Sequence, residues 1–152
     1  MGPGRSALLG LLFLLTVLLP ARGEAFCFEE AGEMYDVPPG LLWAIAKVES
    51  GFDPLAVCVN RNGSVDFGVM QINSCWEGQI DPQTWDNLED PCTNVKVGAR
   101  ILAECIDRLG YTWEGIGCYN AISTDKRAAY ARKVLDVVQQ MRQQTARQND
   151  QP

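Results

Sequence analysis

The residues of this chain that could do chemistry are mainly carboxylates, because the 152-residue sequence contains no histidine. Without histidine, a Ser-His-Asp triad, a Cys-His pair and a histidine-ligated metal site are all excluded. Acid–base chemistry must then be done by Asp, Glu, Lys, Tyr or Cys side chains. The 19 Asp and Glu residues are therefore the first candidates for a catalytic group.

Glu49 is a carboxylate in a position that disfavours its charge. In a helix predicted over residues 39–50, it shares one face with three apolar residues, namely Leu42, Ile45 and Ala46. Burial and the negative end of the helix dipole both disfavour the charged form, so both raise the pKa of Glu49. A carboxylic acid that stays protonated near neutral pH is the general acid of glycosidic cleavage. Periodicity alone fits equally well a glutamate at the helix edge whose carboxylate reaches water.

The segment 66–73 supplies groups suited to a sugar-binding groove. It combines polar side chains and Gly68 with apolar residues, directly before the Cys75-Trp76 pair. A groove that binds sugar needs polar groups for the hydroxyls and apolar or aromatic walls for the ring faces. Four aromatic residues are candidates for such walls, although each fits a core position as well: Trp76, Trp85, Trp113 and Tyr119.

Four motifs follow one another along the chain. They are Glu49-Ser50-Gly51-Phe52, Gly68-Val69-Met70-Gln71-Ile72-Asn73, Cys118-Tyr119-Asn120-Ala121 and Tyr130-Ala131-Arg132-Lys133-Val134. The series resembles the soluble lytic transglycosylase domain of the lysozyme-like superfamily, in the compact muramidase form found with bacterial conjugation and secretion machines. Members cleave the β-1,4 bond between N-acetylmuramic acid and N-acetylglucosamine in peptidoglycan and leave a 1,6-anhydromuramyl end. The resemblance implies a mainly α (α+β), lysozyme-like, two-lobed helical domain over residues 26–142.

The resemblance also implies roles for residues of the first two motifs. Glu49 matches the catalytic glutamate, and Ser50 matches the neighbour that helps to hold the site. Met70 and Gln71 match residues that line the substrate groove, with Val69 in place of the usual leucine.

The last two motifs supply further candidates by the same resemblance. Tyr119 and Asn120 match a substrate-binding pair whose tyrosine lies close to the catalytic glutamate. Tyr130 matches the tyrosine of the last motif, for which a structural role is implied. No cofactor and no metal is expected.

Asp66 is a candidate second carboxylate. The stretch 60–74 also resembles chicken-type lysozymes, in which a second catalytic carboxylate follows the acid by the 17 residues that separate Asp66 from Glu49. A retaining hydrolase needs two carboxylates about 5–5.5 Å apart, whereas a lytic transglycosylase needs one. Asp66 therefore fits a nucleophile, a stabiliser of an oxocarbenium ion or a polar turn residue. A lysozyme-type muramidase stays the alternative function, and a non-catalytic wall-binding module is a weaker one.

The six cysteines indicate disulfide bonds rather than a metal cluster. Their number is even, no Cys-x-x-Cys pair occurs, and an exported chain forms disulfides. Spacing alone allows fifteen pairings. The resemblance to compact relatives implies the first of three candidate pairs, and a tight turn at Gly110 between two helices favours the second: Cys27–Cys92, Cys105–Cys118 and Cys58–Cys75.

The first 23 residues are typical of a secretory signal peptide. A positive charge at Arg5 precedes an apolar run over residues 7–19, and small residues follow. The run is shorter than the roughly 20 apolar residues that span a bilayer, so a membrane anchor is the weaker interpretation. Cleavage after Gly23 or Ala25 is expected, which predicts a periplasmic or secreted protein that meets the membrane only during export.

The candidate residues must be positioned mainly by helices. Helical periodicity, with Pro and Gly residues that mark the helix ends, predicts helices over residues 27–35, 39–50, 69–74, 90–109, 112–122 and 125–141. A small hairpin or loop is predicted near 59–67, where Asn62-Gly63 favours a type I′ turn. A polar, flexible tail is expected over residues 143–152.

The charge of the chain limits its partners. The formal net charge is −6, and no basic patch is visible, so nucleic-acid binding is not expected. The resemblance implies peptidoglycan glycan strands as the substrate and a secretion or conjugation machine as a partner. We expect a monomer.

Overall fold

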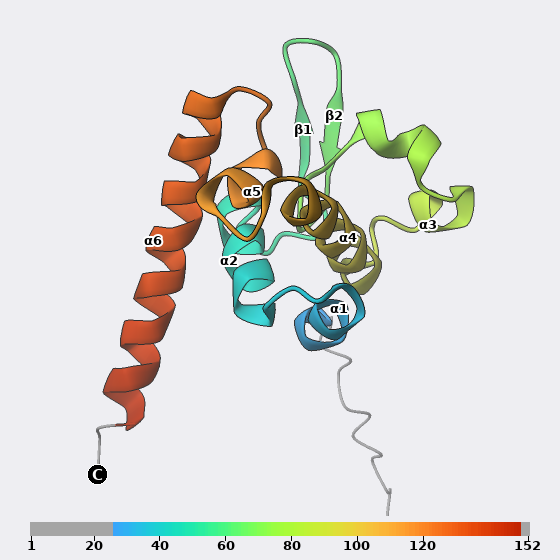
Figure 1. Ribbon diagram of the computed structural model, residues 1–152. Helices are drawn as coiled ribbons and strands as arrows, with labels where there is room; N and C mark the ends of the chain where they lie inside the picture. Colours follow the sequence, from blue (N-terminus) through green and yellow to red (C-terminus); the bar gives the residue numbers. More distant parts are fainter. Residues whose placement is uncertain (1–25, 150–152) are drawn as a thin grey trace, which may run out of the picture.

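The computed structural model describes residues 26–149 and is mainly helical (Figure 1). Along the chain, the elements are α1 (Phe28–Tyr35), α2 (Pro39–Glu49), β1 (Val57–Val59), β2 (Val65–Phe67), β3 (Ile72–Asn73), the 3-10 helix η1 (Ser74–Gln79), α3 (Pro82–Asp86), α4 (Pro91–Leu109), α5 (Trp113–Cys118) and α6 (Thr124–Asn149). The predicted signal peptide and residues 150–152 of the predicted tail lie outside the described residues. The predicted lysozyme-like fold class, mainly α with a small sheet, is confirmed.

Helices α1, α2, α4, α5 and α6 pack together around one hydrophobic core. In Figure 1, α6 runs along α2 and α5, while α4 lies between α1 and α5. The apolar stripe of α4 that the sequence predicted is buried at Val95, Ala99 and Leu102. Asp90 caps this helix, because its carboxylate accepts a hydrogen bond from the Thr93 N–H at 2.7 Å.

The three short strands form one antiparallel sheet in the order β1-β2-β3, and the β1–β2 hairpin projects from the helices (Figure 1). Its loop is closed by a hydrogen bond from the Gly63 N–H to the Asn60 carbonyl at 3.0 Å. Gly63 has φ +86°, whereas Asn62 has no positive φ. The predicted type I′ turn is therefore wrong, because it requires positive φ at both central residues. The loop instead has three residues and ends on a left-handed glycine.

The short helix predicted over residues 69–74 is wrong. Gln71 has φ +50°, which no α-helix allows, and β3 follows at Ile72. The N–H of Met70 donates to the buried Asn94 side chain at 2.8 Å, so a contact across the molecule replaces a helical bond. Only the later turn, η1, is helical, and the Asn73 side chain caps it.

Two helix boundaries also differ from prediction. Helix α5 ends at Cys118 rather than near Ile122, and Gly117 packs so closely on the Arg127 backbone that a Cβ atom there would clash. Helix α6 continues to Asn149 instead of ending near Met141, so residues 143–149 of the predicted flexible tail are helical. The Gln, Arg and Ala residues of this exposed end have high helix propensity. Within residues 26–149, no helix is long and apolar enough to cross a membrane.

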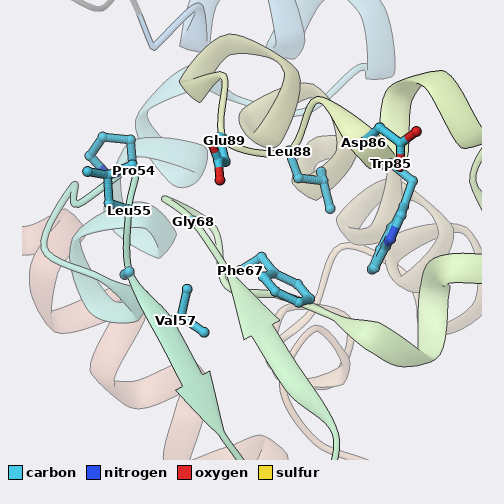
Figure 2. A pocket seen from close by; sticks show the side chains of 10 residues that line it. Pro54, Leu55, Val57, Phe67, Gly68, Trp85, Asp86, Leu88 and Glu89 are labelled. Carbon is cyan, nitrogen blue, oxygen red and sulfur yellow. The ribbon is translucent and has the colours of Figure 1, made fainter.

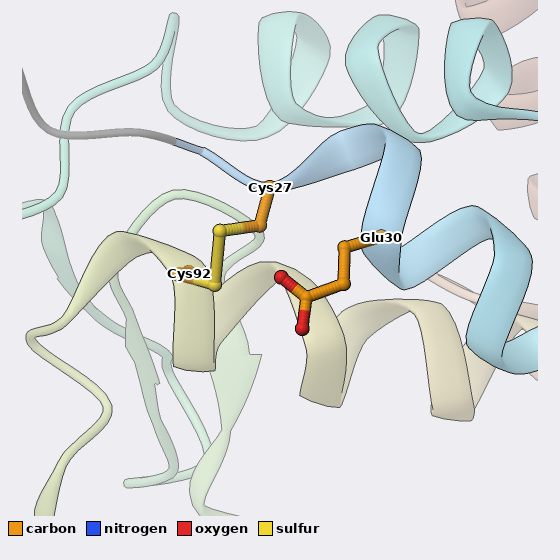
Figure 3. Close-up of side chains that lie close together, drawn as sticks. All are labelled: Cys27, Glu30 and Cys92. Carbon is orange, nitrogen blue, oxygen red and sulfur yellow. A yellow bond between two sulfur atoms is a disulfide. The ribbon is translucent and has the colours of Figure 1, made fainter.

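The structure contains two of the three predicted disulfides. Cys27–Cys92 joins the start of α1 to the first turn of α4 (Figure 3), and Cys105–Cys118 joins α4 to α5.

The predicted Cys58–Cys75 bond is absent, and both residues are exposed free thiols. Cys58 on β1 pairs with Asp66 on β2, which pairs with Asn73 on β3. The middle strand therefore separates β1 from the segment that leads to Cys75. Two strand spacings amount to about 9–10 Å, more than a disulfide spans.

Candidate active site

Glu49 is the last residue of α2, and the buried face of that helix fixes its position. The three apolar residues predicted to share this face have no exposed surface: Leu42, Ile45 and Ala46. Glu49 itself is half-buried, and Gly51, with φ +66°, turns the chain away directly afterwards. The carboxyl group is therefore held at the edge of the core, next to the segment that leads to the sheet.

The pKa of Glu49 is raised from 4.5 to about 7. Burial is the largest cause, since it penalises the charged form. The hydrogen bond from Tyr130 opposes this rise, the negative charge of Asp66 adds to it, and the positive charge of Lys133 lowers the pKa again. The sequence-based prediction of a pKa raised by burial is confirmed. At neutral pH a substantial fraction of Glu49 is protonated, as a general acid requires.

Two tyrosines line the inner side of this carboxyl group. The Tyr130 hydroxyl, from α6, donates to Glu49 Oε1 at 2.5 Å, whereas the Tyr119 hydroxyl donates to the Met70 carbonyl at 2.7 Å. Their rings stack with centroids 6.4 Å apart. Burial and the Glu49 charge raise the pKa of both hydroxyls, so both stay protonated donors. Tyr130, for which only a structural role was expected, is thus the tyrosine that binds Glu49 directly.

Asp66 lies on β2 and is held by amide donors from both neighbouring segments. Asn60 Nδ2 donates to Asp66 Oδ2 at 2.8 Å, and Asn73 Nδ2 donates to Asp66 Oδ1 at 2.5 Å. The Ser64 hydroxyl accepts from both amides as well. Hydrogen bonds to a carboxylate are stronger than neutral ones, so these contacts fix its orientation. The charge of Asp66 acts on Glu49, so the two candidate carboxylates lie within electrostatic range of each other.

Sequence reasoning did not assign Asn60 to the site, and it included Asn73 only as part of the segment 66–73. Strand alternation contains the signal that could have found them. Asn73 pairs directly with Asp66, and Asn60 lies two residues beyond Cys58, the Asp66 partner on β1. Such neighbours point to the same face of a sheet. The strand register was needed to use this signal, and it was not known before the structure.

Ser50 and Gln71 support the site through backbone contacts. The Ser50 hydroxyl donates to the Val69 carbonyl at 2.8 Å and so links the end of α2 to the turn before β3. Gln71 Nε2 donates to the carbonyls of Ala56 and Gly68, which holds the same turn against the start of β1. Both side chains position the walls of the site through these bonds.

The substrate-binding candidates Met70 and Asn120 occupy opposite environments. The Met70 side chain is completely buried and lies against Gly98 of α4, where a Cβ atom would clash with it. The expectation that Met70 lines the groove is therefore wrong for its side chain, which belongs to the core. Asn120 is exposed, and its backbone N–H donates to the Gly117 carbonyl, whereas its side-chain amide has no hydrogen-bond partner among residues 26–149 and is available to a ligand.

Asn94 is the buried polar residue that joins these parts. Its Oδ1 accepts from the Met70 N–H at 2.8 Å, and its Nδ2 donates to the carbonyls of Phe67 and Leu88 at 3.0 Å each. The side chain is completely buried on α4, and all of its bonds are to backbone groups. Helix α4 thereby fixes the end of β2 and the turn that accepts the Tyr119 hydrogen bond.

One group of possible metal ligands occurs among the described residues, at Cys27, Glu30 and Cys92 (Figure 3). The two sulfur atoms are bonded to each other, and the Glu30 carboxylate forms an ion pair with Lys96 at 2.7 Å. The disulfide removes the thiolates that a metal would need. This cluster therefore ties α1 to α4 and is separate from Glu49.

Comparison with known proteins shows the family to which the chain belongs. Residues 26–134 match the model of the transglycosylase SLT domain. Protein IpgF of Shigella sonnei is 40% identical over 119 residues, which cover 76% of this chain and 78% of the relative. Invasion protein IagB of Salmonella typhimurium (strain SL1344) is 34% identical over 147 residues, 91% of this chain and 92% of the relative. A peptidoglycan-binding-like protein of Escherichia coli O157:H7 is 36% identical over 143 residues, 83% of this chain and 85% of the relative. The chain therefore belongs to the transglycosylase SLT domain family and is an enzyme of the peptidoglycan lytic transglycosylase class.

Proposed function

We propose that the enzyme cleaves the bond between N-acetylmuramic acid and N-acetylglucosamine with Glu49 as its catalytic acid and base, and that it forms 1,6-anhydromuramyl ends. One observation carries this proposal, namely a half-buried Glu49 whose pKa is about 7 and whose Oε1 accepts a hydrogen bond from Tyr130. A group with a pKa near the working pH can both give and take a proton within one turnover.

The reaction then proceeds in two proton transfers. Protonated Glu49 donates its proton to the glycosidic oxygen, and the bond from that oxygen to C1 of the muramyl sugar breaks. The resulting carboxylate removes the proton from the 6-hydroxyl of the same sugar, and the freed oxygen attacks C1. No water is consumed, and Glu49 is protonated again at the end.

Digestion of purified peptidoglycan tests both the reaction and the residue. Mass spectrometry of the released muropeptides should show anhydro ends, which are lighter by one water than the reducing ends of a hydrolase. Glu49→Gln should release neither product while keeping its circular dichroism spectrum. Glu33→Gln, which changes an exposed glutamate of α1, is the matched control and should cleave normally. Activity retained in Glu49→Gln would remove Glu49 from the mechanism.

A lysozyme-type hydrolase is the second candidate, and the setting of Asp66 favours it. The carboxylate is oriented by Asn60 and Asn73 and acts electrostatically on Glu49. A carboxylate held in this way suits a nucleophile or a stabiliser of an oxocarbenium ion. In that mechanism water attacks C1, and the product carries a reducing end.

Asp66→Asn separates the two candidates. Asparagine keeps the size of the side chain and removes its charge, so a hydrolase that needs Asp66 should lose about 10³-fold or more in rate. A transglycosylase that needs only Glu49 should keep most of its activity and its anhydro products. Asp86→Asn on the surface of α3 provides the control for a change of net charge.

In the cell, we propose a local role in opening the wall for an envelope-spanning secretion, conjugation or pilus apparatus. The predicted signal peptide over residues 1–23, the two disulfides and the similarity to an invasion protein support a periplasmic or secreted enzyme, and we propose that it acts as a monomer. Deleting the gene and restoring it with the wild type or Glu49→Gln should show assembled apparatus only with the wild type. Equal assembly with both versions would contradict this role.

The predicted cleavage of the signal peptide has its own test. Edman sequencing of the exported protein should give an amino terminus at Glu24 or at Phe26.

A further inference from the structure

The sheet has a second face, opposite Asp66, which borders an apolar hollow. Val57 and Phe67 pair across β1 and β2, so their side chains share the face that Asp66 does not occupy. Figure 2 shows Val57 and Phe67 on one side of the hollow and Leu88 and Trp85 on the other. The cavity measures about 280 Å³, and the Trp85 ring meets the Phe67 ring edge-on at 5.8 Å.

Large apolar side chains continue from this hollow along β1 and the residues just before it. Leu55, Val57 and Val59 are 72%, 64% and 72% exposed. Single exposed apolar residues are ordinary, but three in alternate positions beside an apolar cavity form a continuous surface. A surface of this kind marks a binding site for an apolar partner.

The backbone of β1 is open for pairing along the same edge. The Ala56 carbonyl and the Asn60 N–H bond to β2, so the groups of Val57 and Val59 between them point away from β2. Strand β1 is the first strand of the sheet, and among the described residues no strand pairs with its outer side. An open strand edge is a template for an added extended segment.

The charge of the hollow distinguishes between possible occupants. Of its ten lining residues, Asp86 and Glu89 are exposed carboxylates, and none is basic. Neither carboxylate forms an ion pair within residues 26–149. A second copy of this acidic chain would bring the same carboxylates and be repelled. A segment that carries Lys or Arg gains electrostatic complementarity instead.

We propose that the β1 edge and its hollow form a docking site for an extended segment of a partner protein, in which apolar residues alternate and a basic residue flanks them. The segment adds a strand to β1 through the free backbone groups of Val57 and Val59. Its apolar side chains cover Val57 and enter the hollow, and its basic end meets Asp86 and Glu89. This site lies on the face opposite Asp66, so it is independent of the proposed chemistry of Glu49.

A capped heptapeptide of the sequence Lys-Val-Thr-Val-Thr-Val-Lys provides the probe. Titrated into the ¹⁵N-labelled mature protein, it should shift the amide signals of Val57 and Val59 and slow their hydrogen exchange. The amide of Cys58, which faces β2, should change much less. A peptide N-methylated at alternate residues should not bind, because it lacks the donors that an added strand needs.

Charge reversal supplies the matched variant. Asp86→Lys combined with Glu89→Lys should weaken binding of the Lys-flanked peptide about tenfold and strengthen binding of a Glu-flanked peptide. Both positions are exposed, and peptidoglycan cleavage by this variant should equal that of the wild type. The docking proposal is overturned by the absence of saturable binding, by equal affinity for the two peptides, by shifts centred on Glu49, or by dimer formation through β1 in sedimentation. None of these outcomes bears on the cleavage reaction, which the muropeptide assay tests separately.

Discussion

At the scale of single residues, the proposed chemistry depends on the balance of forces on Glu49. Burial and the charge of Asp66 favour the protonated acid, while Tyr130 and Lys133 favour the carboxylate. The balance places the pKa at about 7, so neither form is strongly preferred near neutral pH. A reaction that uses one group first as acid and then as base benefits from such a balance.

Tyr130→Phe should shift this balance toward the acid. The lost hydrogen bond stabilises the Glu49 carboxylate, so its removal raises the pKa of Glu49 further. Because the reaction begins with protonated Glu49, the decline of kcat/KM at alkaline pH should move upward by about one pH unit.

Tyr119→Phe is the control for this substitution, since its hydroxyl binds the Met70 carbonyl rather than Glu49. It should leave the position of the alkaline decline nearly unchanged. A profile that moves equally in both variants would show that Tyr130 does not act through its bond to Glu49.

Glu49 should also make the folded protein less stable as the pH rises. Its pKa is higher in the folded protein than the value of 4.5 expected for the unfolded chain, so folding favours the protonated form. The stability that the protonated Glu49 contributes to the folded protein is complete below pH 4.5 and is lost as the pH rises through about 7.

Glu49→Gln should therefore raise the free energy of unfolding at pH 8 by about 1–3 kcal/mol. The effect should be near zero at pH 4. Urea unfolding at both pH values measures it. An equal effect of Glu49→Gln at both pH values would contradict the raised pKa.

At the scale of elements, local sequence signals predicted the long helices better than the segment between them. Helix α4 was expected over residues 90–109 and occurs at Pro91–Leu109, because its cap, its proline and its apolar stripe all lie within it. The segment 69–74 was misassigned because its conformation depends on Asn94 and Tyr119, which are distant in sequence. The catalytic candidate Glu49 followed from helical spacing, whereas the bond from Tyr130 required the packing of α6 against α2.

Asn94→Ala should destabilise the protein strongly, since it leaves one buried N–H and two carbonyls without their partner. We expect a loss of about 3 kcal/mol or more in the free energy of unfolding. Urea denaturation followed by circular dichroism measures this loss. Asn87→Ala, which removes an exposed bond to Thr93, should cost less than about 1 kcal/mol. Similar losses in the two variants would show that the buried bonds of Asn94 do not hold the sheet to α4.

At the scale of the whole molecule, two covalent links tie α4 to α1 and to α5, and one polar core residue, Asn94, ties α4 to the sheet. Cys27–Cys92 closes a loop between residues 65 apart, and Cys105–Cys118 closes one between residues 13 apart. A small domain gains from such links, because its core alone buries limited surface. The longer loop should contribute more, since its closure removes more freedom from the unfolded chain.

Replacing both cysteines of one disulfide by alanine, in separate variants for the two disulfides, tests which bond contributes more to stability. Loss of Cys27–Cys92 should lower the free energy of unfolding by about 4 kcal/mol, and loss of Cys105–Cys118 by about 3 kcal/mol. The Cys58→Ser and Cys75→Ser double variant should change it little, because both are exposed free thiols. A large loss in that variant, measured by urea unfolding, would show that the two residues are bonded in solution.

The alternation along β2 also has an evolutionary consequence. Asp66 faces the candidate active site, while its neighbour Phe67 faces the apolar hollow. A shift of the hairpin register by one residue would exchange these two faces. Substitutions in the loop at the exposed Arg61 should therefore be tolerated among descendants of this sequence, whereas gain or loss of a single residue there should be rare. Where the length of this loop does change, the change should keep the Asp66 side chain on the same face of the sheet.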